Sequence, residues 1–146
     1  MKVKDCMCNE VAYLTPESTI YDCAKLMCNK HVGCIPVCDT NKQVVGLVTD
    51  RDVILRSIAC EKDAKSTKVS DIMTCKVCCC GPEDEIENAE ETMSKEQIRR
   101  LPVIDENNKI VGIVTLGDLC ANKYVNTEEV CETLENICNC NNKNAE

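Results

Sequence analysis

An internal repeat constrains this chain more than any other feature of its sequence. Residues 3–55 align with residues 69–121 without a gap, so that Thr49, for example, matches Thr115. Further matched identities are Pro36 with Pro102, Gly46 with Gly112 and Asp52 with Asp118. An extended solenoid needs about three or more units, and this chain has two copies. The sequence therefore predicts a duplicated module.

Each copy carries the same order of local signals. A short apolar stretch, at 11–14 in the first copy and 77–80 in the second, is predicted to form a strand. A helix follows, because apolar residues recur at helical spacing, and Ser18 and Asp84 are the expected N-caps. Two more apolar runs joined by a polar turn, and a second helix, complete the copy. The predicted unit is β-α-β-β-α.

The predicted fold class is mixed α/β (α+β), with two such repeats. Each repeat has too little apolar surface to fold alone, so we expect the two sheets to pack against each other with pseudo-two-fold symmetry. The expected boundaries are residues 1–60 for the first repeat, 61–68 for a linker, 69–122 for the second repeat and 123–146 for a C-terminal segment.

The C-terminal segment is predicted to be an amphipathic helix over residues 127–140, followed by a polar tail. The apolar face of this helix is expected to contain Val130, Cys131, Leu134, Ile137 and Cys138. Such a helix can cover the repeat pair or contribute to self-association.

Charge and composition argue against several classes of partner. Acidic residues outnumber basic ones by 25 to 17, which opposes attraction to nucleic acid or anionic membranes. The sequence has neither an apolar run of about 20 residues nor a secretory signal, so a cytoplasmic location is expected. No nucleophile, acid and orienting group can be assembled around the single histidine, His31, so we expect no catalytic residues and no enzyme activity.

Fifteen cysteines are the unusual part of the composition. An odd number without an export signal favours reduced thiols that pack as small apolar side chains. No metal ligand is therefore predicted. The alternative is a thiol-based metal or redox centre, and the run Cys78, Cys79 and Cys80 is where it would lie.

The second apolar run of each copy ends in a threonine, with an aspartate three residues later. These residues are Thr49 and Asp52 in the first copy, and Thr115 and Asp118 in the second. The start of a helix offers free backbone N–H groups, and a carboxylate can accept bonds from the adjacent hydroxyls of a ribose. The alternative is structural, because first helical turns favour acidic residues in any case.

Four paired stretches stand out in the two copies: VKDCM/VSDIM, TPESTI/GPEDEI, CIPVCD/RLPVID and VVGLVTDRDV/IVGIVTLGDL. Taken together, they resemble a tandem pair of CBS domains of the stand-alone bacterial or archaeal type, over about residues 3–121. The resemblance implies up to two clefts between the sheets, which bind adenosyl compounds. It implies that the Thr and Asp residues hold ribose and nearby phosphate. It also implies that the adenine base contacts backbone and apolar groups of Cys34, Ile35, Pro36, Leu101 and Pro102.

The two copies differ in basic residues near these stretches. Arg99 and Arg100 precede LPV in the second copy, and Arg51 follows Thr49 in the first. Arginines suit bidentate phosphate contacts, so we expect a phosphorylated ligand, namely AMP, ADP or ATP. S-adenosylmethionine and NAD are further candidates, and no cofactor is required. The alternative is that each arginine is a solvated surface charge.

The resulting hypothesis is a non-enzymatic regulatory module. It is expected to form a homodimer, to bind an adenosyl nucleotide between its repeats and to signal to a partner protein in trans. Two alternatives remain open at this point. One is a cysteine-rich metal- or redox-responsive protein on the same scaffold, and the other is a structural dimerisation module with empty clefts.

Overall fold

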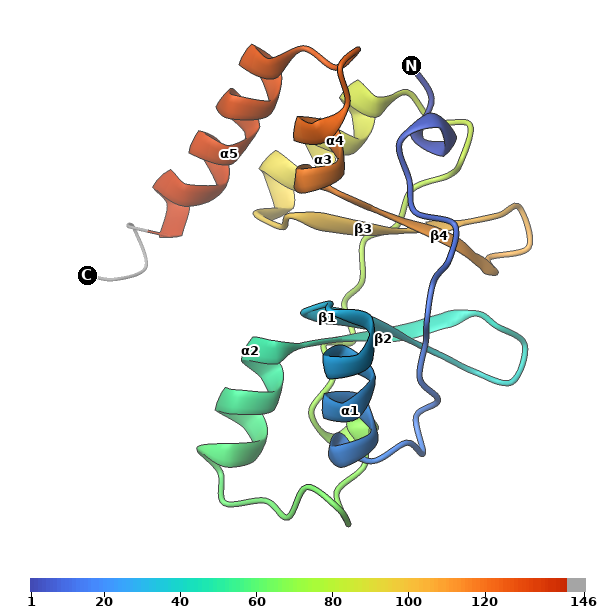
Figure 1. Ribbon diagram of the computed structural model, residues 1–146, viewed down its shortest axis with the longest axis vertical. Helices are drawn as coiled ribbons and strands as arrows, with labels where there is room; N and C mark the ends of the chain where they lie inside the picture. The colour runs from blue at the N-terminus through green and yellow to red at the C-terminus, as the bar shows by residue number, and fades with distance from the viewer. Residues whose placement is uncertain (142–146) are drawn as a thin grey trace. The chain divides into compact units, whose positions relative to one another are not determined.

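The computed structural model describes residues 1–141 of the 146-residue chain, with side chains up to Asn139. Its elements up to residue 71 are η1 (Val3–Asp5), α1 (Ile20–Lys30), β1 (Cys34–Cys38), β2 (Val44–Thr49), α2 (Asp50–Val53), η2 (Ile54–Ile58) and η3 (Val69–Asp71). The remaining elements are α3 (Ile86–Glu96), β3 (Arg100–Ile104), β4 (Ile110–Thr115), α4 (Leu116–Ala121) and α5 (Thr127–Asn141) (Figure 1). This order confirms the predicted mixed α/β class. None of the helices within residues 1–141 combines the length and apolar character that crossing a bilayer requires.

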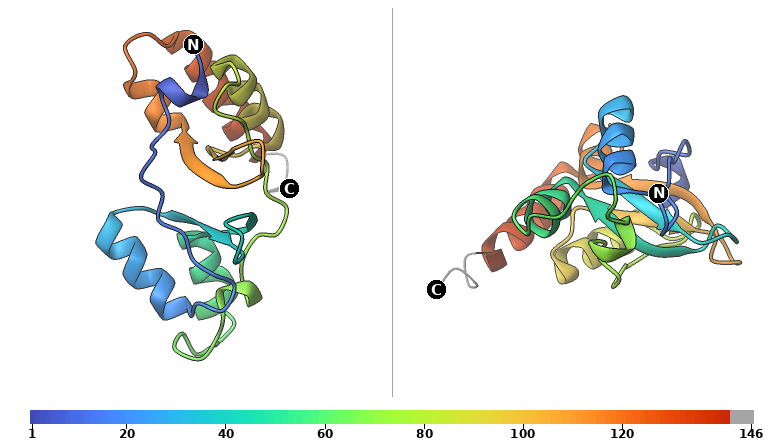
Figure 2. Two further views of the ribbon diagram at one scale, coloured as in Figure 1. Left: turned by 90° about the vertical axis from the view of Figure 1, so that its right-hand side faces the viewer. Right: turned by 90° about the horizontal axis from the view of Figure 1, so that it is seen from below.

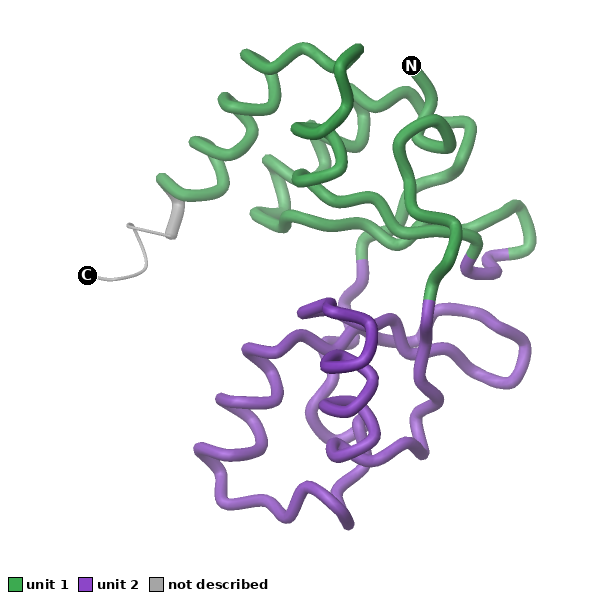
Figure 3. Tube along the Cα trace, in the orientation of Figure 1, with its two compact units in different colours: residues 1–11, 78–107, 111–146 green, residues 12–77, 108–110 purple. Residues whose placement is uncertain are grey.

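The chain divides into two compact units, which Figure 3 shows in green and purple. Unit 2 contains Ala12–Val77 and Asn108–Ile110, and unit 1 contains Met1–Val11, Cys78–Asn107 and Val111–Glu146. The first residues of each repeat, up to Val11 in the first and from Val69 to Val77 in the second, are called its opening segment. Each opening segment therefore belongs to the unit formed by the other repeat.

Unit 2 is built on the antiparallel hairpin of β1 and β2. The register pairs Cys34 with Thr49 and Val37 with Gly46. Both α1 and α2 cover the same face of this hairpin (Figures 1 and 2). The predicted strand at 11–14 is reduced to one parallel bridge between Leu14 and Val37. The buried core of the unit comprises Leu14, Ile20, Cys23, Ile35, Val37, Val48, Val69 and Ile72.

Unit 1 contains the hairpin of β3 and β4 together with α3, α4 and α5. Its predicted strand at 77–80 is likewise a single bridge, between Cys80 and Val103. Ile86, Ala89 and Met93 of α3 recur at helical spacing, and all three side chains are buried. The core also includes Val3, Leu101, Val103, Val114, Leu116, Leu119, Val125, Val130 and Ile137.

The predicted C-terminal helix forms as α5, but its buried face differs from the prediction. Val130 and Ile137 are buried, whereas Leu134, Cys131 and Cys138 are exposed. Thr133 takes the buried position between them, because its hydroxyl donates to the Glu129 carbonyl at 2.9 Å and so needs no partner outside the helix. The predicted polar tail lies, from residue 142 onward, outside the described residues.

The helix caps also correct the sequence prediction. Thr19, not Ser18, caps α1: its hydroxyl accepts from the Asp22 N–H at 3.1 Å, and the Asp22 carboxylate accepts from the Thr19 N–H at 3.1 Å. This reciprocal box satisfies two helix-end donors at once. The predicted cap Asp84 instead accepts from the Gly81 N–H at 2.7 Å, and α3 begins after Glu85 without a side-chain cap.

The helix after β2 turns apolar side chains outward. It consists of α2 and the π-helical turn η2, and Ser57 is the residue of η2 that is buried. Ile54, Leu55 and Ile58 are 54%, 46% and 67% exposed. Val53, Ile54, Ser57 and Ile58 recur at helical spacing, but the wider π-helical turn changes the register, and Ser57 is buried while Ile54 and Ile58 face outward.

Candidate functional site

Thr49 and Asp52 meet at the junction between β2 and α2. The Asp52 N–H donates to the Thr49 hydroxyl at 3.1 Å, and the Thr49 N–H donates to Asp52 Oδ2 at 3.0 Å. The spacing of three residues is therefore the spacing of a capping box. Thr49 and Asp52 therefore have a structural role as the N-terminal cap of α2. Any ligand would bind to groups that the cap already holds in place.

Asp52 has further partners within unit 2. Its side chain is buried at 9% exposure, the Thr74 hydroxyl donates to Oδ2 at 3.4 Å, and Arg56 Nε lies 3.8 Å from Oδ1. Arg56 also donates to the carbonyls of Ile72 and Met73, at 3.3 and 3.4 Å. Both carboxylate oxygens of Asp52 thus have neighbours in the folded chain.

Thr115 and Asp118 repeat the box in unit 1, at the junction of β4 and α4. The Asp118 N–H donates to the Thr115 hydroxyl at 3.1 Å, while the Thr115 N–H and hydroxyl donate to Asp118 Oδ2 at 2.9 and 2.7 Å. Among the side chains described, the hydrogen bonds to this carboxylate all use Oδ2. Oδ1 of Asp118 is therefore available to a hydroxyl donor.

The two boxes differ in Thr74 and Arg56, which no motif in the sequence marked as site residues. At the repeat spacing their counterparts are Cys8 and Asn122, and the Asn122 amide donates to Cys6 Sγ at 3.1 Å instead of facing Asp118. The two copies visibly differ at these positions in the sequence. The sequence does not show, however, that residues 69–77 pack in unit 2, where Thr74 can reach Asp52.

The strand residues expected to face a base lie next to these boxes. Cys34 is the register partner of Thr49, and the side chains of Cys34, Ile35 and Pro36 are all buried. Leu101 and Pro102 are buried in β3 in the same way. Ile35 and Leu101 belong to the cores of their units, and Cys34, Pro36 and Pro102 are also buried, so these residues offer a ligand mainly their backbone.

The predicted arginines differ in their surroundings. The Arg99 carbonyl accepts from the N–H of Leu116 at 2.8 Å, which places Arg99 beside the residue that follows Thr115. Arg99 is exposed and Arg100 half-buried, and neither has an acidic partner within the described residues that forms an ion pair. Arg99 and Arg100 therefore bring two positive charges to this end of unit 1.

The equivalent end of unit 2 is more acidic. Asp50 donates its N–H to the Gly33 carbonyl at 3.0 Å, in the place where Leu116 meets Arg99 in unit 1. A Cβ on Gly33 would lie 2.8 Å from Oδ2 of the exposed Asp50 side chain, so this carboxylate lies close to the Gly33 backbone. Arg51 is exposed in the first turn of α2, between Asp50 and Asp52.

The cysteines are free thiols wherever their side chains are described. Burial raises the pKa of Cys23 to about 11 and that of Cys80 to about 12, and it also raises the pKa of Cys79. Cys75 and Cys78 have the CxxC spacing used in zinc sites, a signal that sequence analysis missed. Within the described residues, no group of three or more His, Cys, Asp or Glu is placed to hold a metal ion.

Comparison with known proteins identifies the family. The sequence model of the CBS domain matches residues 3–58 and 69–123. The chain belongs to the CBS domain family. It is 42% identical over 135 residues to the CBS domain-containing protein YhcV of Bacillus subtilis, an alignment that covers 92% of this chain and 94% of the relative. The resemblance to a stand-alone tandem CBS pair is thereby confirmed.

Three solved structures that resemble this chain contain bound small molecules or metal ions. A structure of CBSX2 in complex with AMP has a TM-score of 0.69 and 29% identity, covering 80% of this chain and 91% of that one. The CBS pair of MJ0100, bound to 5′-methylthioadenosine and S-adenosylmethionine, has a TM-score of 0.74 and 27% identity, covering 82% and 92%. Hypoxic Response Protein I, with two coordinated zinc ions, has a TM-score of 0.76 and 26% identity, covering 82% and 97%. Stand-alone CBS domain proteins are generally regulatory proteins and not enzymes.

Proposed function

We propose that this chain is a regulatory module that binds an adenine nucleotide and passes the signal to another protein in trans. The ligand is AMP, ADP or ATP, held by the Thr and Asp residues at the ribose and by arginines at the phosphates. Binding acts by a difference in ligand affinity between two arrangements of the protein. The adenosyl ligands of CBSX2 and MJ0100 support the ligand class.

The proposal rests on four residues of unit 1, namely Thr115, Asp118, Arg99 and Arg100. Asp118 offers a free Oδ1 among the described contacts, and two arginines lie at the start of the adjacent strand without acidic partners. A ribose hydroxyl suits the first group and a phosphate suits the second. The unit 2 set, with Asp50 beside Arg51, is the weaker site for an anion.

A homodimer is part of the proposal. The outward-facing Ile54, Leu55 and Ile58 of η2 form an exposed apolar patch, which favours association. The free thiols of the described residues support a cytoplasmic location, where thiols stay reduced.

A zinc- or redox-responsive protein is the competing candidate, and the zinc ions of Hypoxic Response Protein I favour it. The raised pKa values of Cys79 and Cys80 count against it, because metal binding and thiol chemistry need the thiolate. Zinc or iron that co-purifies in stoichiometric amount, and is lost when Cys78, Cys79 and Cys80 are all replaced by serine, would establish it.

The deciding experiment is isothermal titration of the reduced, metal-free protein with AMP, ADP, ATP, NAD and S-adenosylmethionine. Binding of one ligand that Asp118→Ala abolishes and Asp52→Ala preserves supports the unit 1 site. Thermal unfolding gives a second readout, since ligand at 100 times its Kd stabilises the fold by about 2.7 kcal/mol. Failure of all five ligands would leave a structural dimerisation module as the better description.

A further inference from the structure

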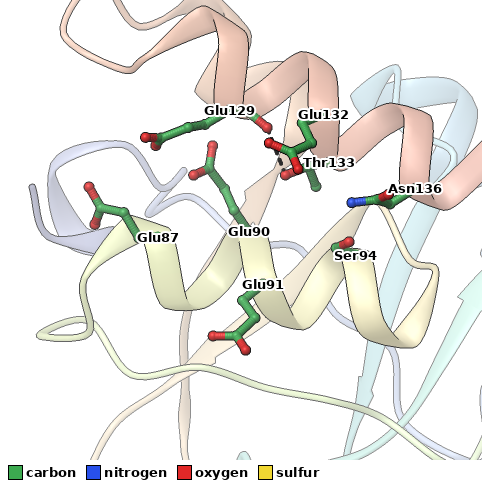
Figure 4. Close-up of a pocket in the computed structure, with 8 residues that line it drawn as sticks. All are labelled: Glu87, Glu90, Glu91, Ser94, Glu129, Glu132, Thr133 and Asn136. Carbon is green, nitrogen blue, oxygen red and sulfur yellow. Dashed lines mark hydrogen bonds between the residues drawn. The ribbon is translucent and has the colours of Figure 1, made fainter.

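A groove between α3 and α5 in unit 1 is unusually rich in carboxylates (Figure 4). Its volume is about 320 Å³. The residues that line it are Glu87, Glu90, Glu91 and Ser94 of α3 and Glu129, Glu132, Thr133 and Asn136 of α5. None of these described lining residues is Lys, Arg or His.

Glu90 is the residue that makes the groove more than an acidic surface. Its side chain is 4% exposed, and its Oε1 atom is buried without a hydrogen-bond partner in the described structure. Figure 4 shows the Glu90 carboxylate pointing from α3 toward Glu129 of α5. An unpaired polar atom in such a position is costly, so it calls for a partner from outside the chain.

The electrostatics of the groove favour a positively charged partner. Burial, and then the negative charges of Glu129 and Glu87, raise the pKa of Glu90. Glu91 on α3 and Glu132 on α5 add further negative charge around it. A bound cation would stabilise the ionised form of Glu90 and relieve the repulsion among these carboxylates.

The shape and chemistry of the groove fit an extended organic cation better than a bare metal ion. Within the described residues, no three of the carboxylates are placed to share one metal. The groove runs instead along two helices, with carboxylates at Glu87, Glu90 and Glu129 and neutral acceptors at Ser94 and Asn136. An alkylammonium ion donates three hydrogen bonds from each charged end, and its methylene chain needs no partner.

We propose that the groove between α3 and α5 binds a linear polyamine, with the Glu90 carboxylate as its anchor. The site is separate from the Thr115 and Asp118 box, so it would let the module respond to a second small molecule. Its occupant is a free alkylammonium compound, and not a basic segment of a protein.

The test is isothermal titration of the full-length protein with spermidine at low ionic strength. One site per chain is expected, and Glu90→Gln should weaken binding at least tenfold because it removes the anchoring charge and keeps the shape. Glu106→Gln is the matched control: it removes the same charge from the exposed turn between β3 and β4, and should leave the affinity unchanged. Titration in buffers of different ionisation enthalpy should show protons released on binding by the native protein, and fewer in Glu90→Gln.

Four outcomes overturn the proposal. The first is no saturable binding of spermidine, and the second is an equal loss in the Glu90 and Glu106 variants, which would mean diffuse attraction to a chain of net charge −8. The third is tighter binding of Mg²⁺ that depends on Glu90, which would make the groove a metal site. The fourth is binding of a lysine-rich peptide much more tightly than spermidine, which would make it a protein-docking surface. None of these outcomes depends on whether the protein binds a nucleotide.

Discussion

Gly46 of β2 lies against Met73 so closely that a Cβ built on Gly46 would overlap the Met73 Sδ and lie 2.9 Å from its Cγ. Gly112 of β4 meets Met7 in the same way, with a Cβ 2.6 Å from Met7 Sδ and 3.1 Å from the Cys8 carbonyl. The lack of a side chain at each glycine therefore leaves room for the methionine in the opening segment of the other repeat. Backbone hydrogen bonds stabilise both contacts, between Leu47 and Thr74 in unit 2 and between Cys8 and Ile113 in unit 1.

Gly46→Ala and Gly112→Ala should each destabilise the protein by about 1–3 kcal/mol, because overpacking forces the opening segment away from the strand. The cost should be larger at Gly112, where the Cβ would also meet backbone. Urea unfolding measures both. Gly117→Ala is the control, since its Cβ would lie 3.5 Å from Thr115 Oγ1 and the change favours a helix. Equal stability of all three variants would contradict this account of the contact.

Asp52→Ala should cost more stability than Asp118→Ala. Both changes remove a capping box, which is worth about 1–2 kcal/mol, but Asp52 also loses the bond from Thr74 and the ion pair with Arg56. We expect nucleotide affinity to fall in the opposite order, with Asp118→Ala the more damaging. Measuring stability and affinity on the same variants separates the two roles, and a parallel loss at both sites would argue against a single working site in unit 1.

The double variant Arg99→Ala/Arg100→Ala should weaken ATP binding at least about tenfold, since a charge-assisted hydrogen bond is worth about 1.5–3 kcal/mol. Adenosine affinity should change little, because adenosine has no phosphate. Lys95→Ala/Lys123→Ala carries the same change in net charge at other exposed positions of unit 1 and should behave like the native protein. An equal loss for ATP and adenosine would show that the arginines shape the site and do not contact phosphate.

Ile58→Glu should disrupt the proposed homodimer, because it places a charge in the patch of Ile54, Leu55 and Ile58. Light scattering on the eluting protein measures the mass directly. Val32→Glu, at another exposed apolar position, should leave the dimer intact. If the native protein is still monomeric at a concentration of about 100 μM, the patch is not a strong interface.

Much of the fold could be predicted from the repeat and its periodicity. The helices and the two hairpins lie where the apolar patterns placed them, because those patterns record which side chains face a core. The errors come from local competition. Thr19, and not Ser18, caps α1 because Asp22 completes a capping box with it. The stretches at 11–14 and 77–80 each pair with a strand at one residue, so each forms a bridge and not a strand.

The site was predictable in part, and for a physical reason. Thr49 and Asp52 are close in sequence, and so are Arg99 and Arg100, so spacing alone brings them together. Thr74 reaches Asp52 because the opening segment of the second repeat packs in unit 2, and Glu90 meets Glu129 because α5 folds back on α3. Such long-range neighbours depend on packing, which a pattern within one stretch does not record.

The stability of the protein should depend on pH through Glu90. In the folded chain the pKa of Glu90 is raised, first by burial and then by Glu129 and Glu87. Between the ordinary glutamate pKa and the raised value, Glu90 therefore holds its proton more often in the folded than in the unfolded chain, so the contribution of Glu90 to the free energy of unfolding falls as the pH rises through that window. Glu90→Gln has no proton to lose there, so its stability relative to the native protein should increase with pH and level off above the raised pKa. Urea unfolding from acid to neutral pH measures this difference, and Glu106→Gln, at an exposed position, is the control for the loss of one charge. A difference between Glu90→Gln and the native protein that stays constant over this range would mean that Glu90 titrates alike in the folded and unfolded chains, and that its buried carboxylate has a partner after all.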